Sequence, residues 1–132
     1  RLDTIQAIIL NKKIKRLPYH NKQRQKIAKI YNTKIINNKI TKLEHSKSSV
    51  YHQYVILVKN RKKLIKLLES KKIQYGFHYP FAIHQLKIFK NMFKKQKYEN
   101  AERLAREGIS IPIDPNLSIS EINFIINTLN SF

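Results

Sequence analysis

The stretch "VYHQYVILV", residues 50–58, decides how the rest of the chain is arranged. It is rich in β-branched and aromatic residues, which favour extended backbone, and it is the clearest strand in the sequence. Its second half, residues 55–58, has no polar position. A strand without a polar face is covered on both sides. We therefore expect this strand to lie in the middle of a sheet.

Two helices are predicted upstream of the strand. Residues 3–17 carry a wide apolar stripe that Pro18 should end, formed by Ile5, Ile9, Leu10, Ile14 and Leu17. A second helix should run from Pro18 to residue 36, with one apolar face formed by Ile27, Ile30, Tyr31 and Ile35. We expect these helices to form a pair over residues 3–36. The polar, aperiodic residues 37–49 predict a loop.

Downstream of the strand, short strands and helices alternate. Asn60 is a typical cap for a helix whose core face is Leu64, Ile65, Leu67 and Leu68. "IQYGF", residues 73–77, predicts a short strand, and we expect a helix over residues 84–95. A helical repeat over residues 101–108 leads into "ISIP", residues 109–112, a strand that Pro112 closes. Ser118 and Glu121 form a capping box before a final helix with the apolar stripe Ile122, Ile125, Ile126 and Leu129.

These elements predict an α+β fold of two layers. About five helices should pack on a small, mostly antiparallel sheet of about three strands. A length of 132 residues suits one compact domain, residues 1–132. We divide it into the helix pair 3–36 and a sheet-and-helix part, 50–132.

The composition excludes several classes of function. The chain has no cysteine, so it can form no disulfide, thiolate nucleophile or cysteine zinc site. With 2 glycines it cannot build a glycine-rich phosphate loop, and no Ser-His-Asp set is indicated. No apolar run reaches the ~18 residues of a membrane span, and the start of the chain lacks a signal-cleavage site. We expect a soluble, cytoplasmic protein without a membrane partner.

The formal charge of +19 raises another interpretation, a basic module that binds nucleic acid. Of the 27 basic residues 21 are Lys and 6 are Arg, whereas recognition of bases and phosphates favours Arg. A coding bias towards A and T explains the lysines without a ligand, so we expect nucleic acid not to be a partner. The alternative requires one concave strip that contains Lys12, Lys13, Lys22, Lys26, Lys29, Lys62, Lys63 and Lys94.

Two histidines flank a proline in "YGFHYPFAIHQ", residues 75–85. His78 and His84 lack the i, i+4 spacing of a helical zinc pair and have no carboxylate between them, so we expect no metal site. His52 alternates with Tyr54 on the predicted strand and is expected to be a hydrogen-bonded structural residue. Aromatic clusters beside a proline commonly plug a core, so the residues alone leave the role of this stretch open.

Five segments follow one another along the chain: "RLDTIQAIIL", "IAKIYN", "YHQYVILV", "GFHYPFAIH" and "NAERLAREGISIPIDPNLSISEINFII". This succession resembles, over nearly all 132 residues, the C-terminal part of the pyridoxal-phosphate sugar aminotransferases of the DegT/DnrJ type. Two positions depart from the family pattern. Ala82 stands where a second proline is usual, and Leu86 stands where glutamine is common, which concerns fine substrate contacts rather than membership.

The resemblance implies the small C-terminal domain of a fold-type-I transferase. Family members are homodimers that transfer an amino group, usually from glutamate, to a keto group on a nucleotide-linked sugar in polysaccharide or deoxyaminosugar biosynthesis. Their cofactor, pyridoxal 5'-phosphate, is bound mainly by a large domain, where a lysine forms the Schiff base. This sequence has neither the family's Ser-Phe-x-x-x-Lys stretch nor its acidic motif. Since the sequence starts at Arg1, we expect both upstream, in a large domain absent here, and expect these residues to be inactive alone.

The resemblance also implies which residues face the substrate. "GFHYP" matches a strand-to-loop segment, in which Gly76 should give backbone freedom and Pro80 should fix the exit. His78, Tyr79 and His84 are then substrate-binding candidates, and Arg1 resembles the arginine of an Asn-x-Arg segment that reaches the neighbouring subunit's site. No catalytic residue is expected in these 132 residues. A regulatory homologue that has lost transferase activity is an alternative.

Overall fold

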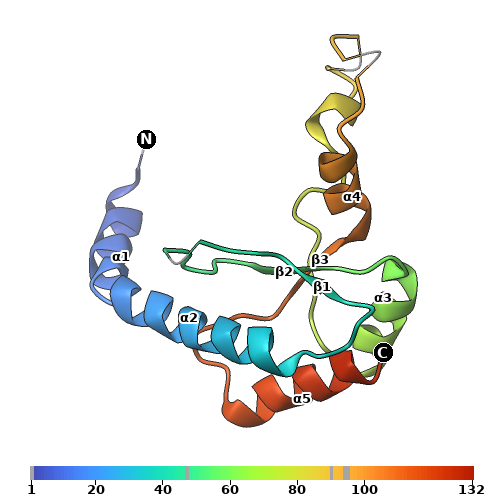
Figure 1. The fold of residues 1–132 in the computed structure, drawn as a ribbon. Helices are drawn as coiled ribbons and strands as arrows, with labels where there is room; N and C mark the ends of the chain where they lie inside the picture. The colour runs from blue at the N-terminus through green and yellow to red at the C-terminus, as the bar shows by residue number, and fades with distance from the viewer. Residues whose placement is uncertain (1, 47, 90, 94–95) are drawn as a thin grey trace.

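The computed structural model describes residues 2–46, 48–89, 91–93 and 96–132. This part contains five α-helices and a three-stranded antiparallel sheet (Figure 1). The elements in chain order are α1 (Thr4–Ile14), α2 (Leu17–Lys34), β1 (Thr41–Lys42), β2 (Tyr54–Leu57), α3 (Arg61–Ser70), the 3-10 turn η1 (Ile83–Gln85), α4 (Glu99–Glu107), β3 (Gly108–Ile111) and α5 (Ile119–Asn130). The prediction of an α+β fold with about five helices and three strands is confirmed.

Strand β2 lies between β1 and β3 and pairs antiparallel with both. The prediction that the apolar end of "VYHQYVILV" is central in the sheet is therefore confirmed. The strand is shorter than predicted, and ahead of it Tyr51 has a positive φ of 49°, which interrupts the extended backbone there. His52 lies ahead of the strand and is exposed, so the prediction of a structural histidine on the strand face is wrong.

One face of the sheet packs against α2 and α5, which lie together beneath it in Figure 1. The rings of Tyr31 on α2 and Tyr54 on β2 meet edge to face, with centroids 5.1 Å apart. The Tyr31 hydroxyl donates to the carbonyl oxygen of Pro112 over 2.9 Å, and the Tyr54 hydroxyl donates to Asn32 Oδ1 over 2.6 Å. Burial raises the pKa of both tyrosines, so they stay protonated as donors. These contacts join the sheet to α2.

The predicted caps of α3 and α5 are confirmed. Asn60 Oδ1 accepts a hydrogen bond from the backbone N–H of Lys63 over 3.2 Å, and Leu64 and Leu68 bury the inner face of α3. Ser118 and Glu121 exchange hydrogen bonds in both directions at the start of α5. Each cap satisfies backbone donors that have no partner inside the helix.

Helix α1 carries the apolar stripe predicted for residues 3–17, but none of its residues is buried. Ile5, Ile9 and Ile14 are 69%, 49% and 63% exposed. Figure 1 shows α1 rising away from the start of α2, after a turn that precedes Pro18. Within the described residues nothing covers this stripe.

Three local predictions are wrong in the described residues. Residues 37–49 were expected to be a loop, yet Thr41 and Lys42 pair with Leu57 and Ile56, and Lys42 Nζ caps α2 by donating to the carbonyls of Asn32 and Ile35. Residues 73–77 form a single bridge, Gly76 to Ser110, instead of a strand. The expected helix over residues 84–95 is reduced to η1 in the described residues, and Leu86, Ile88 and Met92 are exposed. Residues 90, 94 and 95 lie outside the described part.

The two glycines are not used for backbone freedom, because neither has a positive φ. The expectation for Gly76 is therefore wrong. A Cβ at Gly108 would lie 2.5 Å from the Leu104 carbonyl oxygen, whereas a Cβ at Gly76 would lie 3.3 Å from His78 Nε2, the end of a movable side chain. Gly108 is needed for the close approach of α4 to β3, and Gly76 leaves space for the His78 ring.

We predict that Gly108→Ala lowers the free energy of unfolding by about 1 to 3 kcal/mol, the usual cost of overpacking against a fixed backbone. Urea unfolding followed by circular dichroism measures the change. Gly76→Ala is the matched control and should leave stability within about 0.5 kcal/mol of the parent. Equal losses in both variants would contradict this assignment.

Candidate functional site

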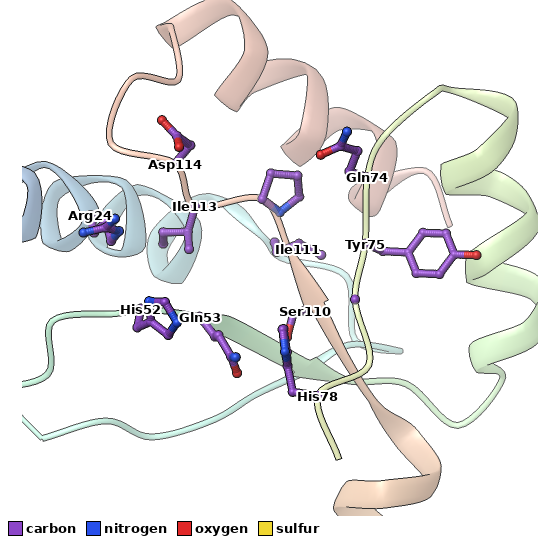
Figure 2. A pocket seen from close by; sticks show the side chains of 12 residues that line it. Arg24, His52, Gln53, Gln74, Tyr75, His78, Ser110, Ile111, Ile113 and Asp114 are labelled. Carbon is purple, nitrogen blue, oxygen red and sulfur yellow. The ribbon is translucent and has the colours of Figure 1, made fainter. Parts of the chain in front are cut away.

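A cleft of about 400 Å³ opens beside the ends of β2 and β3. Four segments form it: α2, the residues ahead of β2, the segment after α3, and β3 with the residues that follow. We call it the histidine cleft, and its polar side chains are Arg24, His52, Gln53, Gln74, His78, Ser110 and Asp114. Figure 2 shows His78 next to Ser110, with Arg24 on α2 and Asp114 beyond β3 around the same open space. Imidazole, amide, hydroxyl, guanidinium and carboxylate groups therefore meet in one place.

The position of His78 follows from the bridge between Gly76 and Ser110. The two residues exchange backbone hydrogen bonds of 3.1 and 2.9 Å, so the chain runs beside β3 for one residue pair only. Phe77 then places its ring 4.6 Å from the guanidinium carbon of Arg61. These anchors fix the backbone directly ahead of the exposed His78 side chain.

A second, apolar cavity of about 320 Å³ adjoins the cleft on the face of the sheet opposite α2 and α5. We call it the apolar groove; its wall includes Val55, Phe77, Tyr79, Phe81, Ile83 and Leu104. Gln53, Gly76, His78 and Ser110 line both cavities. Tyr79 is 81% exposed and belongs to the groove rather than the cleft.

His84 lies apart from the residues that line the cleft. Its Nε2 is 3.0 Å from Glu102 Oε1 on α4, and its ring centroid is 4.9 Å from that of Tyr98. The hydrogen bond to His84, followed by one from the Tyr98 backbone N–H, holds the pKa of the Glu102 carboxyl below its usual range. The structure thus brings His78 and Tyr79 together and places His84 in a contact between the proline segment and α4. Arg1 lies outside the described residues.

Sequence reasoning missed Arg24, Gln53, Ser110 and Asp114. Ser110 carried a signal, because it is the one polar residue of "ISI" in β3 and so had to lie on the opposite face from Ile109 and Ile111. Arg24 carried none, since it is a basic residue on a helix with many other polar positions.

The described lysines have few buried contacts. Every described lysine is exposed except Lys42, which is half-buried and donates to two carbonyls. The described residues contain no group of three His, Cys, Asp or Glu side chains that could hold a metal ion. No described helix is long and apolar enough to cross a membrane. Among the described lysines of the strip that the nucleic-acid alternative requires, Lys12 and Lys13 on α1 lie at the opposite end of the molecule from Lys62 and Lys63 on α3 (Figure 1).

A profile of the DegT/DnrJ/EryC1/StrS aminotransferase family matches residues 1–130. The chain belongs to this family. It is 31% identical, over its full length, to a dTDP-3-amino-3,6-dideoxy-alpha-D-galactopyranose transaminase of Aneurinibacillus thermoaerophilus. It is 28% identical, again over its full length, to a protein of Geobacillus stearothermophilus named pleiotropic regulatory protein. The chain spans 37% of the length of each of these relatives.

A solved structure of the same family has this fold. The crystal structure of a DegT DnrJ EryC1 StrS aminotransferase from Brucella abortus matches all of the chain with a TM-score of 0.89 and 28% identity. The chain covers 36% of that structure. The DegT-family resemblance of the five sequence segments is thus confirmed, together with the α+β small-domain fold.

The contact between Glu102 and His84 predicts a pH-dependent stability. Because the folded pKa of Glu102 is lowered, its contribution is complete above the unfolded value of about 4.3 and is lost as the pH falls through the lower folded value. Glu102→Gln should therefore lower the melting temperature at pH 7, and the difference from the parent should shrink below about pH 4.

Glu99→Gln is the control, because Glu99 lies in the same first turn of α4 and is exposed. It removes the favourable interaction of a carboxylate with the helix N-terminus but not the histidine contact. Equal shifts in melting temperature for Glu99→Gln and Glu102→Gln would show that the helix terminus alone accounts for the effect.

Proposed function

We propose that this chain is the C-terminal, substrate-side domain of a pyridoxal-phosphate-dependent aminotransferase that acts on a nucleotide-linked keto sugar. The family match over residues 1–130 carries the proposal. The relative from Aneurinibacillus thermoaerophilus is named for a dTDP-linked amino sugar, which supports this substrate class. Because the chain spans 37% of that relative, we assign the remaining machinery to a large domain outside these residues.

The residue types support a division of labour between the two domains. Pyridoxal phosphate, when bound, supplies the electron sink for amino transfer. A lysine that reacts with it must be desolvated, and the described lysines are exposed or, for Lys42, bonded to carbonyls. This chain therefore contributes no catalytic lysine in the proposal. It binds and orients the sugar.

The histidine cleft has the groups for this task. His78, Gln53 and Ser110 can donate to or accept from sugar hydroxyls, and Arg24 can pair with a phosphate oxygen. Tyr79 in the adjoining groove, together with His84 and Arg1, completes the proposed substrate-binding set. Glu102 orients the His84 ring through the 3.0 Å contact with Nε2.

The amino donor, assembly and location follow from family membership in this proposal. Glutamate donates the amino group, the whole protein is a cytoplasmic homodimer, and its product enters polysaccharide or deoxyaminosugar biosynthesis. Arg1 of one subunit then reaches the site of the other.

The first test locates the reactive lysine. Full-length protein loaded with pyridoxal phosphate is reduced with borohydride, digested and analysed by mass spectrometry. We expect one stoichiometric pyridoxyl-lysine, outside residues 1–132. A single stoichiometric adduct on a lysine within these residues would refute the division of labour.

The second test concerns His78 in the full-length enzyme. His78→Asn keeps some hydrogen bonding and replaces an exposed side chain, so the melting temperature should barely change. Turnover of the keto sugar should fall about 30- to 1000-fold, which corresponds to about 2 to 4 kcal/mol of lost transition-state stabilisation. Both quantities are measured on one preparation.

His45→Asn is the matched control, because His45 is exposed and lies outside the cleft, beside Tyr51. It should retain the parent turnover. If His78→Asn instead lowers the melting temperature and the folded enzyme keeps normal turnover, His78 is a packing residue and Tyr79 loses most of its support.

A regulatory function is the second candidate, favoured by the relative named pleiotropic regulatory protein. Turnover of a nucleotide-linked keto sugar by the full-length protein separates the two. An aminotransferase transfers the amino group, whereas a regulatory homologue without transferase activity shows no turnover, whether or not borohydride reduction gives a pyridoxyl-lysine.

A further inference from the structure

A cavity of about 660 Å³ lies at the opposite end of β2 from the histidine cleft. It forms where the residues after α2, the end of β2, the start of α3 and the end of α4 meet. We call it the basic cavity and define it by Lys39, Lys59, Lys63, Arg103, Glu107 and Phe132. Strand β2 has 4 residues, and each residue adds about 3.3 Å to the length of a strand. The histidine cleft and the basic cavity therefore open at the two ends of a short strand.

Two of the four cations are held in place by protein contacts. Lys39 Nζ donates to the carbonyl oxygen of Phe132 over 3.1 Å and lies 5.8 Å from the centroid of its ring. Arg103 Nε donates to Glu107 Oε2 over 3.0 Å. Charges that are positioned before a ligand arrives lose less conformational freedom on binding, and this applies to Lys39 and Arg103.

The wall of the cavity is also fixed. Arg61, the first residue of α3, donates from one terminal nitrogen to the carbonyls of Ala105 and Gly108 over 2.8 and 3.0 Å. The backbone N–H of Val58 donates to the Glu107 carbonyl over 3.0 Å. The end of α4 is therefore tied both to α3 and to the residue after β2, so Lys63 and Arg103 face the cavity from elements with a defined separation.

The charges of the cavity do not cancel. Among the described residues that line the cavity, Glu107 has the one carboxylate side chain, and this side chain, 8% exposed, already accepts hydrogen bonds from Arg103 and Arg106. Lys39, Lys59 and Lys63 face the same space without further acidic lining residues. Like charges around one cavity repel, and the positive end of α3 adds to the field. An anion would remove this repulsion.

We propose that the basic cavity binds a small molecule that carries a phosphate or diphosphate group, held by Lys39, Lys59, Lys63 and Arg103. Lysine ammonium groups suit phosphate as point charges, and Arg103 can add a planar donor pair. The volume lies within the range of small-molecule sites, and the Phe132 ring offers a flat apolar surface for the rest of the ligand. This proposal does not depend on the aminotransferase function.

Pyrophosphate is the probe, and calorimetry on the full-length protein at constant ionic strength is the measurement. We expect a saturable site with one pyrophosphate per chain. Lys59→Gln and Lys63→Gln should each weaken binding about tenfold, as expected for the loss of one charge-assisted contact. Arg103 is not substituted in this test, because its removal would take away one of the positive charges that pair with the buried Glu107 carboxylate.

Lys66→Gln is the matched control: it removes the same charge from the same helix, but Lys66 does not line the cavity. It should bind pyrophosphate like the parent. Arg24→Gln, which removes the cation of the histidine cleft, should also leave this site intact.

Absence of saturable binding would overturn the proposal, and so would equal weakening by Lys63→Gln and Lys66→Gln, which would indicate a general effect of net charge. If Arg24→Gln alone abolishes pyrophosphate binding, the binding site is the histidine cleft, and the assignment to the basic cavity is refuted. A duplex oligonucleotide that binds more tightly than pyrophosphate, and equally in all variants, would point to nonspecific attraction of polyanions.

Discussion

The pairing of β2 on both of its edges is the constraint on which the other elements depend. Each of its four residues faces a partner in β1 or β3, so the strand cannot shift by one residue without turning Tyr54 and Ile56 away from the core. Tyr54 then meets Tyr31, and both hydroxyls find acceptors. A buried hydroxyl left without a partner costs about 1 to 3 kcal/mol, so this arrangement fixes how α2 lies on the sheet.

The same alternation determines where the cavities lie. Tyr54, Ile56, Ile109 and Ile111 face α2 and α5, and the opposite face therefore presents Val55, Ser110 and Gly108. That face is covered only in part, by α4 and by the segment that joins β3 through Gly76. His78 owes its position to this segment, because the chain leaves β3 after one bridge. The proposed binding residue thus stands on an irregular segment held by a rigid sheet, and functional residues are often found on such segments.

The sequence predicted those parts of the fold that local chemistry determines. Asn60, Pro18 and the pair Ser118 and Glu121 mark helix starts wherever the chain runs, and the apolar run 55–58 requires a central strand. Prediction from the sequence failed where a segment depends on partners far along the chain. Thr41 and Lys42 form a strand because they pair with Leu57 and Ile56 on one edge of β2. Two polar residues give no strand signal of their own. The helix expected over residues 84–95 has suitable spacing, but Leu86, Ile88 and Met92 stay exposed, so periodicity alone was misleading.

The candidate site was predictable only through the resemblance, and for a physical reason. A cleft is defined by groups from distant segments, and Arg24, Gln53 and Asp114 have no mutual spacing that a sequence could reveal. His78 and Tyr79 were visible because they stand in a segment with its own pattern. The two cavities at the ends of β2 also differ in charge. The cleft is lined by one guanidinium and one carboxylate, whereas the other end of β2 gathers four cations around one carboxylate. The excess of lysine is therefore not concentrated at the proposed sugar site. The long-range electric field of the lysines attracts anions to the whole chain. Selectivity between different anions has to come from the few charged side chains that protein contacts hold in place.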